Sequence, residues 1–543
     1  MFLTCRRRLL DGAGFFLRLD TAMTTPKSGH RDAFFVLNGI EMTTTGPLRK
    51  IVIVGGGTAG WMVANALSKV LGKSGPAITL IESEEIGTVG VGEATIPPIL
   101  AFNALLGINE VEFMKETQAT FKLGIEFVDW LRIGHRYFHP FGIYGVDAGA
   151  VPFEALWQRS RHLGTPRPLN DFSVCARAAA MGRFMRPAGA GGPLAHLAYA
   201  YHFDATLYAR FLRKYAEAAG VTRIEGRIAH TSQRPDDGFI EAVTTQDGRR
   251  IEADFFIDCS GFHALLIGGV MGAKFEDWNH WLPNDRAVAA PSANMAPPTP
   301  FTTSTSRTAG WQWRIPLQHR TGNGYVYSSA HSSDQAAQDL LTTNIAGDLL
   351  AEPRVIKFRT GRQRAFWIKN CLALGLASGF MEPLESTSIH LVQAGIARLL
   401  EMLPNRSCDP ADIRRYNRLM TTEYDSIRDF IILHFHATER RDTQYWRSLA
   451  NMSIPDTLAE RIDIYRHSGR VFRESDDLFS KTSWLAVMDG QGLVPQAYDP
   501  LAEGVSPEQA QKHMEHIASV QAAAVKTMPS HHNYIAKYCS TAQ

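Results

Sequence analysis

Lys50-Ile51-Val52-Ile53-Val54-Gly55-Gly56-Gly57-Thr58-Ala59-Gly60-Trp61 is the stretch that decides the fold. Apolar β-branched residues run into three glycines, and a helical apolar pattern follows, so the stretch predicts a strand, a tight turn and a helix. Gly55, Gly57 and Gly60 have the G-x-G-x-x-G spacing, which lets the backbone approach a pyrophosphate and lets the helix pack on the strand. We expect the free N–H groups at the start of this helix to bind phosphate.

Glu82 lies at the position expected for a carboxylate that binds the ribose of a dinucleotide. The apolar run Ala77-Ile78-Thr79-Leu80-Ile81 predicts a second buried strand, and it ends at Glu82, 22 residues after Gly60. A dinucleotide-binding unit places an acidic residue at about this distance. The sequence therefore predicts a site for FAD or NAD(P), and the alternative is an ordinary glycine-rich turn of an α/β protein.

Composition excludes several classes of protein. The chain has 543 residues, 45% of them hydrophobic, and a formal net charge of only +2, so nothing indicates nucleic-acid binding. No apolar run reaches the roughly 20 residues needed to cross a bilayer. The six cysteines show no CxxC or paired spacing, which argues against a metal centre or a disulfide framework and for a reducing compartment, the cytoplasm.

Strands and helices interleave along the chain, which predicts an α/β fold with an at least partly parallel sheet. We divide the chain into a disordered extension, 1–49, with the functional start near Met42, and an FAD-binding module, 50–400. Substrate-module insertions interrupt that module at about 106–194 and 276–355. A mostly helical part, 401–543, completes the substrate module.

Three further patterns have both a structural and a functional interpretation. Residues 121–130 alternate as in a strand, and on pattern alone Lys122 shares the polar face with Glu126 as a solvated surface lysine. Ser386, Thr387 and Ser388 precede a helical pattern from Ile389, so they form an anion site or simply cap the helix.

Aromatic residues give the third pattern. His139 and Phe141 lie in a glycine-containing aromatic loop, which builds either an apolar substrate pocket or plain packing. Trp311 and Trp313 share one face of a strand, as core residues also do. Periodicity alone does not separate these alternatives.

Together these stretches resemble the flavin-dependent tryptophan halogenases over most of residues 50 to about 450. The resemblance rests on the glycine-rich turn, on Gly90-Val91-Gly92-Glu93-Ala94-Thr95, on Trp311-x-Trp313-x-Ile315-Pro316 and on Glu382-Pro383-Leu384-Glu385-Ser386-Thr387. It implies a flavoprotein-monooxygenase-like FAD-binding fold with an integrated substrate module. It also implies FADH2 supplied by a separate flavin reductase, O2, and chloride or bromide that is oxidised to hypohalous acid.

The resemblance also assigns roles to residues. Lys122 guides the halogen to one carbon of an electron-rich aromatic, and Glu385 accepts the proton or stabilises the cationic intermediate. Thr387 and Ser388 hold the halide, and Trp311 and Trp313 shield the flavin. His139, Phe141 and Trp484 contact the substrate. The expected cofactor contacts are Gly55, Gly56, Gly57, Ala59, Gly60, Glu82, Ser83, Ile86, Val91, Ala94, Ile228, Leu384 and Ile389, with no metal.

Two departures from the family pattern bear on specificity. Ser388 stands where well-known members have glycine, which leaves the halide preference open. Residues 473–484 lack the tyrosine pair that grips the amino acid in tryptophan-specific members, so we expect indole or an indole derivative as substrate. The alternatives are a halogenase of free tryptophan, a flavin-dependent aromatic hydroxylase and a flavin-binding protein without chemistry. A homodimer is compatible with the resemblance.

Overall fold

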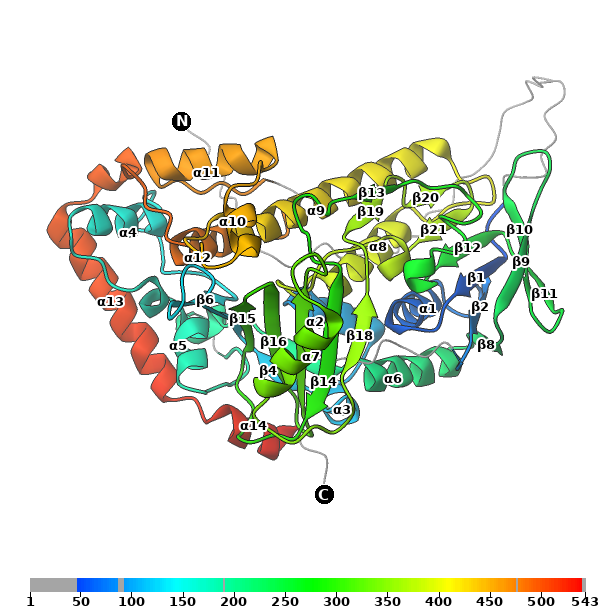
Figure 1. Ribbon diagram of the computed structural model, residues 1–543, viewed down its shortest axis with the longest axis horizontal. Coiled ribbons are helices and arrows are strands. Elements are labelled where there is room, and N and C mark those ends of the chain that lie inside the picture. Colours follow the sequence, from blue (N-terminus) through cyan, green and yellow to red (C-terminus); the bar gives the residue numbers. More distant parts are fainter. Residues whose placement is uncertain (1–45, 86–91, 189–190, 475–476, 540–543) are drawn as a thin grey trace, which may run out of the picture.

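The structure, a computed structural model, describes residues 46–85, 92–188, 191–474 and 477–539 (Figure 1). The expectations for residues 1–45, including a start near Met42, and for Ile86 and Val91 lie outside these ranges. Residues 46–49 of the expected extension are packed against the rest of the chain. Leu48 is buried, and the Arg49 N–H donates to Asp254 Oδ2.

A six-stranded sheet carries the glycine-rich turn. Its order is β20-β21-β12-β1-β2-β8, and all neighbours are parallel except β20 and β21. β1, in the middle of this sheet, is buried on both faces from Ile51 to Val54, which explains its run of apolar residues. This sheet confirms the α/β fold. Its strands are β1 (Lys50–Val54), β2 (Ala77–Glu82), β8 (Thr222–Glu225), β12 (Phe255–Asp258), β20 (Trp367–Ile368) and β21 (Cys371–Ala373).

A seven-stranded sheet joins the two predicted insertions. Its order is β18-β14-β17-β16-β15-β5-β6, and β15 pairs in parallel with β5. Strands from 106–194 and from 276–355 therefore share one sheet, which supports the proposal that both belong to one substrate module. The strands are β5 (Gly124–Val128), β6 (Arg136–Pro140), β14 (Arg286–Ser292), β15 (Thr302–Arg307), β16 (Gly310–Pro316), β17 (Thr321–Tyr327) and β18 (Arg354–Lys357).

The remaining strands of the described chain form three small sheets. The sheet β3-β7-β4 contacts β16 and β17 through β3, so it lies beside the large sheet. Its strands are β3 (Gly92–Ala94), β4 (Thr120–Lys122) and β7 (Ala200–Asp204). The other two sheets consist of β9 (Ile228–Gln233), β10 (Ile240–Thr245) and β11 (Arg250–Glu252), and of β13 (Phe275–Asp277), β19 (Gly361–Gln363) and β22 (Gly379–Phe380).

Helices cover the sheets, and the described part of the chain after residue 401 is mostly helical. α1 packs against α6 and α8 beside the six-stranded sheet, and α13 runs along the outside of the molecule (Figure 1). The second half of α9 is buried among neighbouring helices. The helices are α1 (Thr58–Leu71), α2 (Pro98–Leu106), α3 (Glu110–Glu116), α4 (Phe153–His162), α5 (Val174–Ala180), α6 (Ala205–Ala218), α7 (Asp334–Thr343), α8 (Ser388–Glu401), α9 (Pro410–His436), α10 (Gln444–Ala450), α11 (Asp456–Ser468), α12 (Lys481–Gly490), α13 (Pro507–Lys526) and α14 (His531–Tyr538).

The alternating run 121–130 is not one strand. β4 ends at Lys122 in the small sheet, and β5 begins at Gly124 in the large one. Leu123 lies between them and donates its N–H to Pro300 O. The prediction that Lys122 is a solvated surface residue is therefore wrong, because the chain changes sheets immediately after it and Lys122 is fully buried.

Candidate active site

The glycine-rich turn has the shape that a dinucleotide needs. Gly55 has φ +114°, and a Cβ there would lie 2.2 Å from Cys259 O; a Cβ at Gly60 would lie 1.9 Å from Gly55 O. A Cβ at Gly57 would meet nothing within 4 Å, and α1 begins after Gly57 without a side-chain cap. The space above the turn is thus open, and the first N–H groups of α1 are free for a pyrophosphate.

Glu82 ends β2 beside this turn. Its Oε2 accepts a hydrogen bond of 3.3 Å from Trp61 Nε1, and its Oε1 is paired with Arg223. A Cβ at Gly56 would overlap the Glu82 carboxylate, so only glycine allows the turn and the carboxylate to lie so close. This geometry fits a carboxylate that binds a ribose hydroxyl.

The remaining expected cofactor contacts lie on several elements. Ser83 follows β2, Ala94 ends β3, and Ile228 begins β9. Leu384 and Ile389 are buried around the start of α8. A Cβ added at Gly375, in the turn after β21, would lie 2.7 Å from the Cβ of Ala59 on α1 and 3.8 Å from Cγ2 of Val392 near the start of α8. The starts of α1 and α8 are thereby brought together, while residues 86–91 lie outside the described chain.

Lys122 is a buried amine with a single hydrogen-bond partner in the described chain. Its Nζ donates to Ser386 Oγ at 2.8 Å and lies 5.3 Å from the centre of the Phe141 ring. Burial lowers the pKa of Lys122 to about 7, although the nearby Glu385 carboxylate raises it. At neutral pH the amine is therefore partly unprotonated and can act as a hydrogen-bond acceptor or a nucleophile.

Glu385 is a buried carboxylate held between two histidines. His139 Nδ1 lies 3.0 Å from its Oε2, and His434 Nε2 lies 2.8 Å from its Oε1 without the alignment of a hydrogen bond. Burial works to raise the pKa of Glu385, but the interactions with His139 and His434 outweigh it and lower the pKa to about 2. The carboxylate is ionised and able to accept a proton.

The chain turns sharply between Glu385 and α8. Ser386 has φ +60°, an uncommon conformation for a residue with a side chain, and this turn carries its hydroxyl to Lys122. Thr387 precedes α8 and makes no side-chain cap bond, and the first bond within the helix is from Leu391 N–H to Thr387 O. The N–H groups at Ser388 and Ile389 are therefore available to an anion.

The two tryptophans lie on β16 with ring centroids 6.1 Å apart. Trp311 Nε1 donates to Glu382 Oε2, and Asn284 donates to the same oxygen at 2.9 Å. Glu382 and Glu385 lie on the same short loop but contact different groups. Glu382 accepts from the Trp311 indole, whereas Glu385 lies between His139 and His434. Trp313 is also buried, and its Nε1 has no partner among the described residues.

The expected substrate contacts are only partly brought together. His139 and Phe141 both lie at the Lys122–Glu385 pair, through the contacts given above. Trp484 contacts Phe430, with ring centroids 4.8 Å apart, and Phe430 stacks on Phe479 at 3.8 Å. Phe430 in turn lies 5.8 Å from His139, so Trp484 reaches this region through a second layer of aromatic rings.

Sequence reasoning missed His434 as a site residue. It lies on α9, four residues after Phe430, and its side chain is fully buried. A histidine one turn after an aromatic residue in an apolar helical run is the signal that was present. That signal is weak, because most such histidines simply pack in a core.

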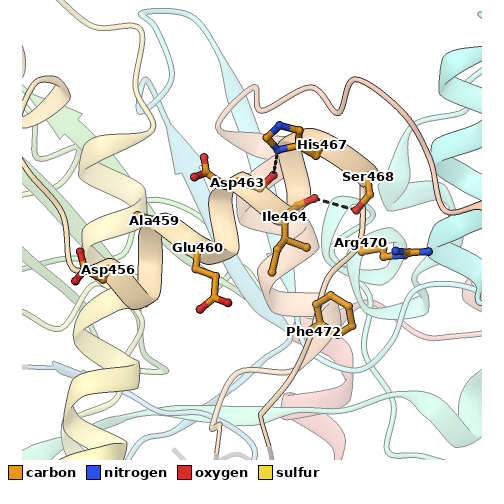
Figure 2. A pocket seen from close by; sticks show the side chains of 9 residues that line it. All are labelled: Asp456, Ala459, Glu460, Asp463, Ile464, His467, Ser468, Arg470 and Phe472. Carbon is orange, nitrogen blue, oxygen red and sulfur yellow. Dashed lines mark hydrogen bonds between the residues drawn. The ribbon is translucent and has the colours of Figure 1, made fainter.

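A surface groove of about 690 Å³ lies elsewhere, along α11 and the segment after it (Figure 2). Its lining includes Asp456, Glu460, Asp463, His467 and Phe472, and none of its residues is among those of the site. His467 Nδ1 and Ser468 Oγ bond to backbone carbonyls of their own helix, as Figure 2 shows. Two of the polar side chains that line the groove are therefore already hydrogen-bonded within α11.

Neither a metal centre nor a membrane-spanning helix is found among the described residues. They contain no group of three or more His, Cys, Asp or Glu side chains that could hold a metal ion. None of the helices described here has the length and apolar character to cross a membrane.

Comparison with known proteins agrees with this geometry. The family model for tryptophan halogenases matches residues 50–507. The chain is 36% identical to tryptophan 7-halogenase RebH of Lentzea aerocolonigenes, over 90% of this chain and 99% of that protein.

Solved structures give the same result. A flavin-dependent halogenase of Xanthomonas campestris, Xcc4156, is 47% identical with a TM-score of 0.88, covering 91% of this chain and 99% of that one. BrvH, a flavin-dependent halogenase from Brevundimonas sp. BAL3, is 44% identical with a TM-score of 0.87, covering 90% and 99%.

The family implies FAD and a halide, which the open turn at Gly57 and the uncapped start of α8 fit, together with a separate flavin reductase and an aromatic substrate. The resemblance drawn from the sequence motifs is confirmed, and the hydroxylase alternative is not favoured. The chain belongs to the tryptophan halogenase family and is a flavin-dependent halogenase.

Proposed function

We propose that the chain chlorinates or brominates an electron-rich aromatic, indole or an indole derivative, and that Lys122 and Glu385 direct the reaction. When bound, the reduced flavin would activate O2, and O2 is the oxidant that converts the halide to hypohalous acid. The observation that carries the proposal is the geometry of two buried groups: the Lys122 amine donates to Ser386 Oγ at 2.8 Å, and the neighbouring residue, Glu385, is a buried carboxylate held by His139 at 3.0 Å. The lowered pKa of each group, about 7 for Lys122 and about 2 for Glu385, fits these roles.

Lys122, Glu385 and the start of α8 have separate roles in this reaction. The amine of Lys122 binds hypohalous acid or takes its halogen as a haloamine, so that the halogen is presented to one ring carbon. That carbon forms its bond to halogen and becomes cationic, and Glu385 then removes its proton. The net change replaces hydrogen with halogen on the aromatic and converts hypohalous acid to water. Thr387 and Ser388 would hold the halide at the start of α8.

The other cofactor contacts are proposed from their placement. Gly55, Gly56, Gly57, Ala59 and Gly60 would surround the pyrophosphate, and Glu82 with Ser83 would bind the adenosine end. Ala94, Leu384 and Ile389 would contact the ring system. Trp311 and Trp313 would keep organic substrate away from it.

The proposed preference for indole over tryptophan rests on residues 473–484. Besides lacking a tyrosine pair, this segment has a buried carboxylate, Asp477, which is held by Arg461 at 2.6 Å and by Ser426 at 2.6 Å. Asp477 is thus buried with its charge neutralised by Arg461, which makes it a poor site for the ammonium group of an amino acid. His139 and Phe141 would instead hold the flat ring.

One assay tests the proposal. The enzyme, FAD, a flavin reductase and NADH are given indole and tryptophan in competition, with bromide and chloride together, and the products are measured by mass spectrometry. We expect halogenated indole to dominate. Faster halogenation of tryptophan would overturn the substrate assignment, and hydroxylated product without halide would overturn the function.

Two further assignments stay proposals. The described cysteines, Cys175, Cys259, Cys371, Cys408 and Cys539, are all free and buried, which supports a reducing compartment such as the cytoplasm. A homodimer stays a prediction, to be tested by the mass of the protein in solution.

A further inference from the structure

The strand that carries Lys122 lies at the edge of its sheet. β4 pairs on one side with β7, where Phe121 faces Tyr201 and Lys122 faces Ala200. An edge strand leaves backbone N–H groups without a strand partner on its outer side. The N–H of Phe121 is satisfied in an unusual way, because it donates to Nε2 of His531 at 3.1 Å, on a helix 410 residues further along the chain.

The His531 imidazole bridges two backbone segments. Its Nδ1 lies 2.8 Å from Pro298 O, a carbonyl that can only accept, so Nδ1 carries the proton and Nε2 is free to accept from Phe121. The two contacts together require the neutral ring, because in the protonated ring Nε2 would carry a hydrogen and could not accept from Phe121. The side chain is buried, and burial lowers its pKa to about 4, which keeps it neutral throughout the physiological range.

The two neighbours of Lys122 are tied to the same segment. The Leu123 N–H donates directly to Pro300 O at 2.7 Å, and the Phe121 N–H reaches Pro298 O through the imidazole. Lys122 lies between these two ties, so its backbone is fixed on both sides. The imidazole takes the place that a neighbouring strand would occupy.

α14 holds His531 in place by contacts of its own. The His531 N–H donates to Gly182 O at 2.8 Å, and Ser530 caps the helix start. The Phe121 ring stacks on Phe184 at 3.9 Å and meets Tyr534 of α14 edge-on at 5.7 Å. The helix therefore reaches β4 with a defined orientation rather than through one hydrogen bond.

We propose that His531 is a positioning residue for halogen transfer, and that its imidazole holds the Phe121 N–H and thereby fixes the backbone from which Lys122 reaches Ser386. The inference rests on the proposed role of Lys122. A buried amine has to present a halogen to one carbon, and displacement of a reacting group by about 1 Å costs about 100-fold in rate. The last described helix of the chain thus acts on the site through β4 without contacting the cofactor turn.

Three variants of the full-length holoenzyme test the proposal: His531→Ala, His531→Gln and the control His532→Ala, whose side chain is exposed. Amide hydrogen exchange is measured at Phe121. Halogenated product per FADH2 consumed is measured with indole and bromide, and untransferred hypohalous acid is trapped with monochlorodimedone. FAD affinity and the melting temperature are followed in parallel.

We expect His531→Ala to speed exchange at Phe121, to lower product per FADH2 by about 10- to 100-fold and to raise trapped hypohalous acid, with FAD affinity unchanged. The glutamine amide offers both an acceptor and a donor, so His531→Gln should restore most of the product, and His532→Ala should match the unmodified enzyme.

Several results would overturn the proposal. One is unchanged product per FADH2 in His531→Ala, and another is lost product with unchanged exchange at Phe121. If His531→Ala does not fold, rapid exchange of the Phe121 amide in the unmodified enzyme, or no restoration by His531→Gln, would overturn it as well. Absence of halogenated product from the unmodified enzyme would instead contradict the proposed function and leave the exchange result intact.

Discussion

Replacing Lys122 with methionine should make the protein more stable while removing its activity. The lysine is fully buried, and its pKa falls from 10.5 to about 7 on folding. Between these values the unfolded chain binds more protons than the folded one, so stability rises with pH across that range. The folded state therefore bears a penalty that is largest below pH 7 and vanishes above pH 10.5.

The size of the penalty follows from the two pKa values. It is about 5 kcal/mol at pH 6, about 3 kcal/mol at pH 8 and about 1 kcal/mol at pH 10. Methionine has a similar length and no charge, so Lys122→Met removes the penalty and loses only the hydrogen bond to Ser386, about 1 kcal/mol. The net gain at pH 8 is about 2 kcal/mol, or about 2 °C in melting temperature for a chain of this size.

The assay is denaturant unfolding of the apoprotein at pH 6, 8 and 10, with Lys122→Met and the unmodified chain side by side. Lys69→Met is a matched control, because Lys69 is an exposed lysine on α1. The gain from Lys122→Met should shrink as the pH rises, and the control should show no such trend. A variant that is less stable at pH 6 and pH 8, or a gain independent of pH, would refute the reasoning about the buried amine.

Four other predictions follow from the same contacts. Glu385→Gln should keep FAD binding but lower kcat about 100- to 1,000-fold, measured by product formation, because the proton acceptor is lost; retained kcat would exclude Glu385 as the base. Product formation in the unmodified enzyme should rise between pH 6 and pH 8 as Lys122 loses its proton, since its pKa is about 7, while a flat profile would contradict that role. Ser388→Gly should raise the bromide share of the product in halide competition by enlarging the anion site, and a higher chloride share would contradict this placement. Gly60→Ala should abolish FAD retention, because a Cβ there lies 1.9 Å from Gly55 O, and normal FAD content would refute the packing argument.

The sequence was most informative where function depends on local backbone geometry. The strand, glycine turn and helix at residues 50–60 are set by neighbours in the chain, and the structure has them as predicted. The uncapped helix start after Thr387 is likewise a local feature. Such features can be predicted because the residues that determine them lie within one or two turns of each other.

The environment of Lys122 could not be predicted in this way. Its burial depends on a change of sheet at Leu123 and on Ser386, 264 residues away, and a period-two pattern contains neither fact. The same holds for His434 and His531, which reach the site region from α9 and α14. Only the family resemblance indicated Lys122. The local signal for His434 was weak, and no local pattern indicated His531.

The central claim is that oxidised halogen produced at the flavin is delivered to substrate by the Lys122 amine. The most direct measurement compares Lys122→Ala with the unmodified enzyme, using flavin reductase, bromide and indole, while regioselective product and trapped hypohalous acid are counted against FADH2 consumed. The account predicts that Lys122→Ala binds FAD, consumes FADH2 and releases hypohalous acid, yet forms no regioselective product. Regioselective product formed by Lys122→Ala at the unmodified rate would contradict it.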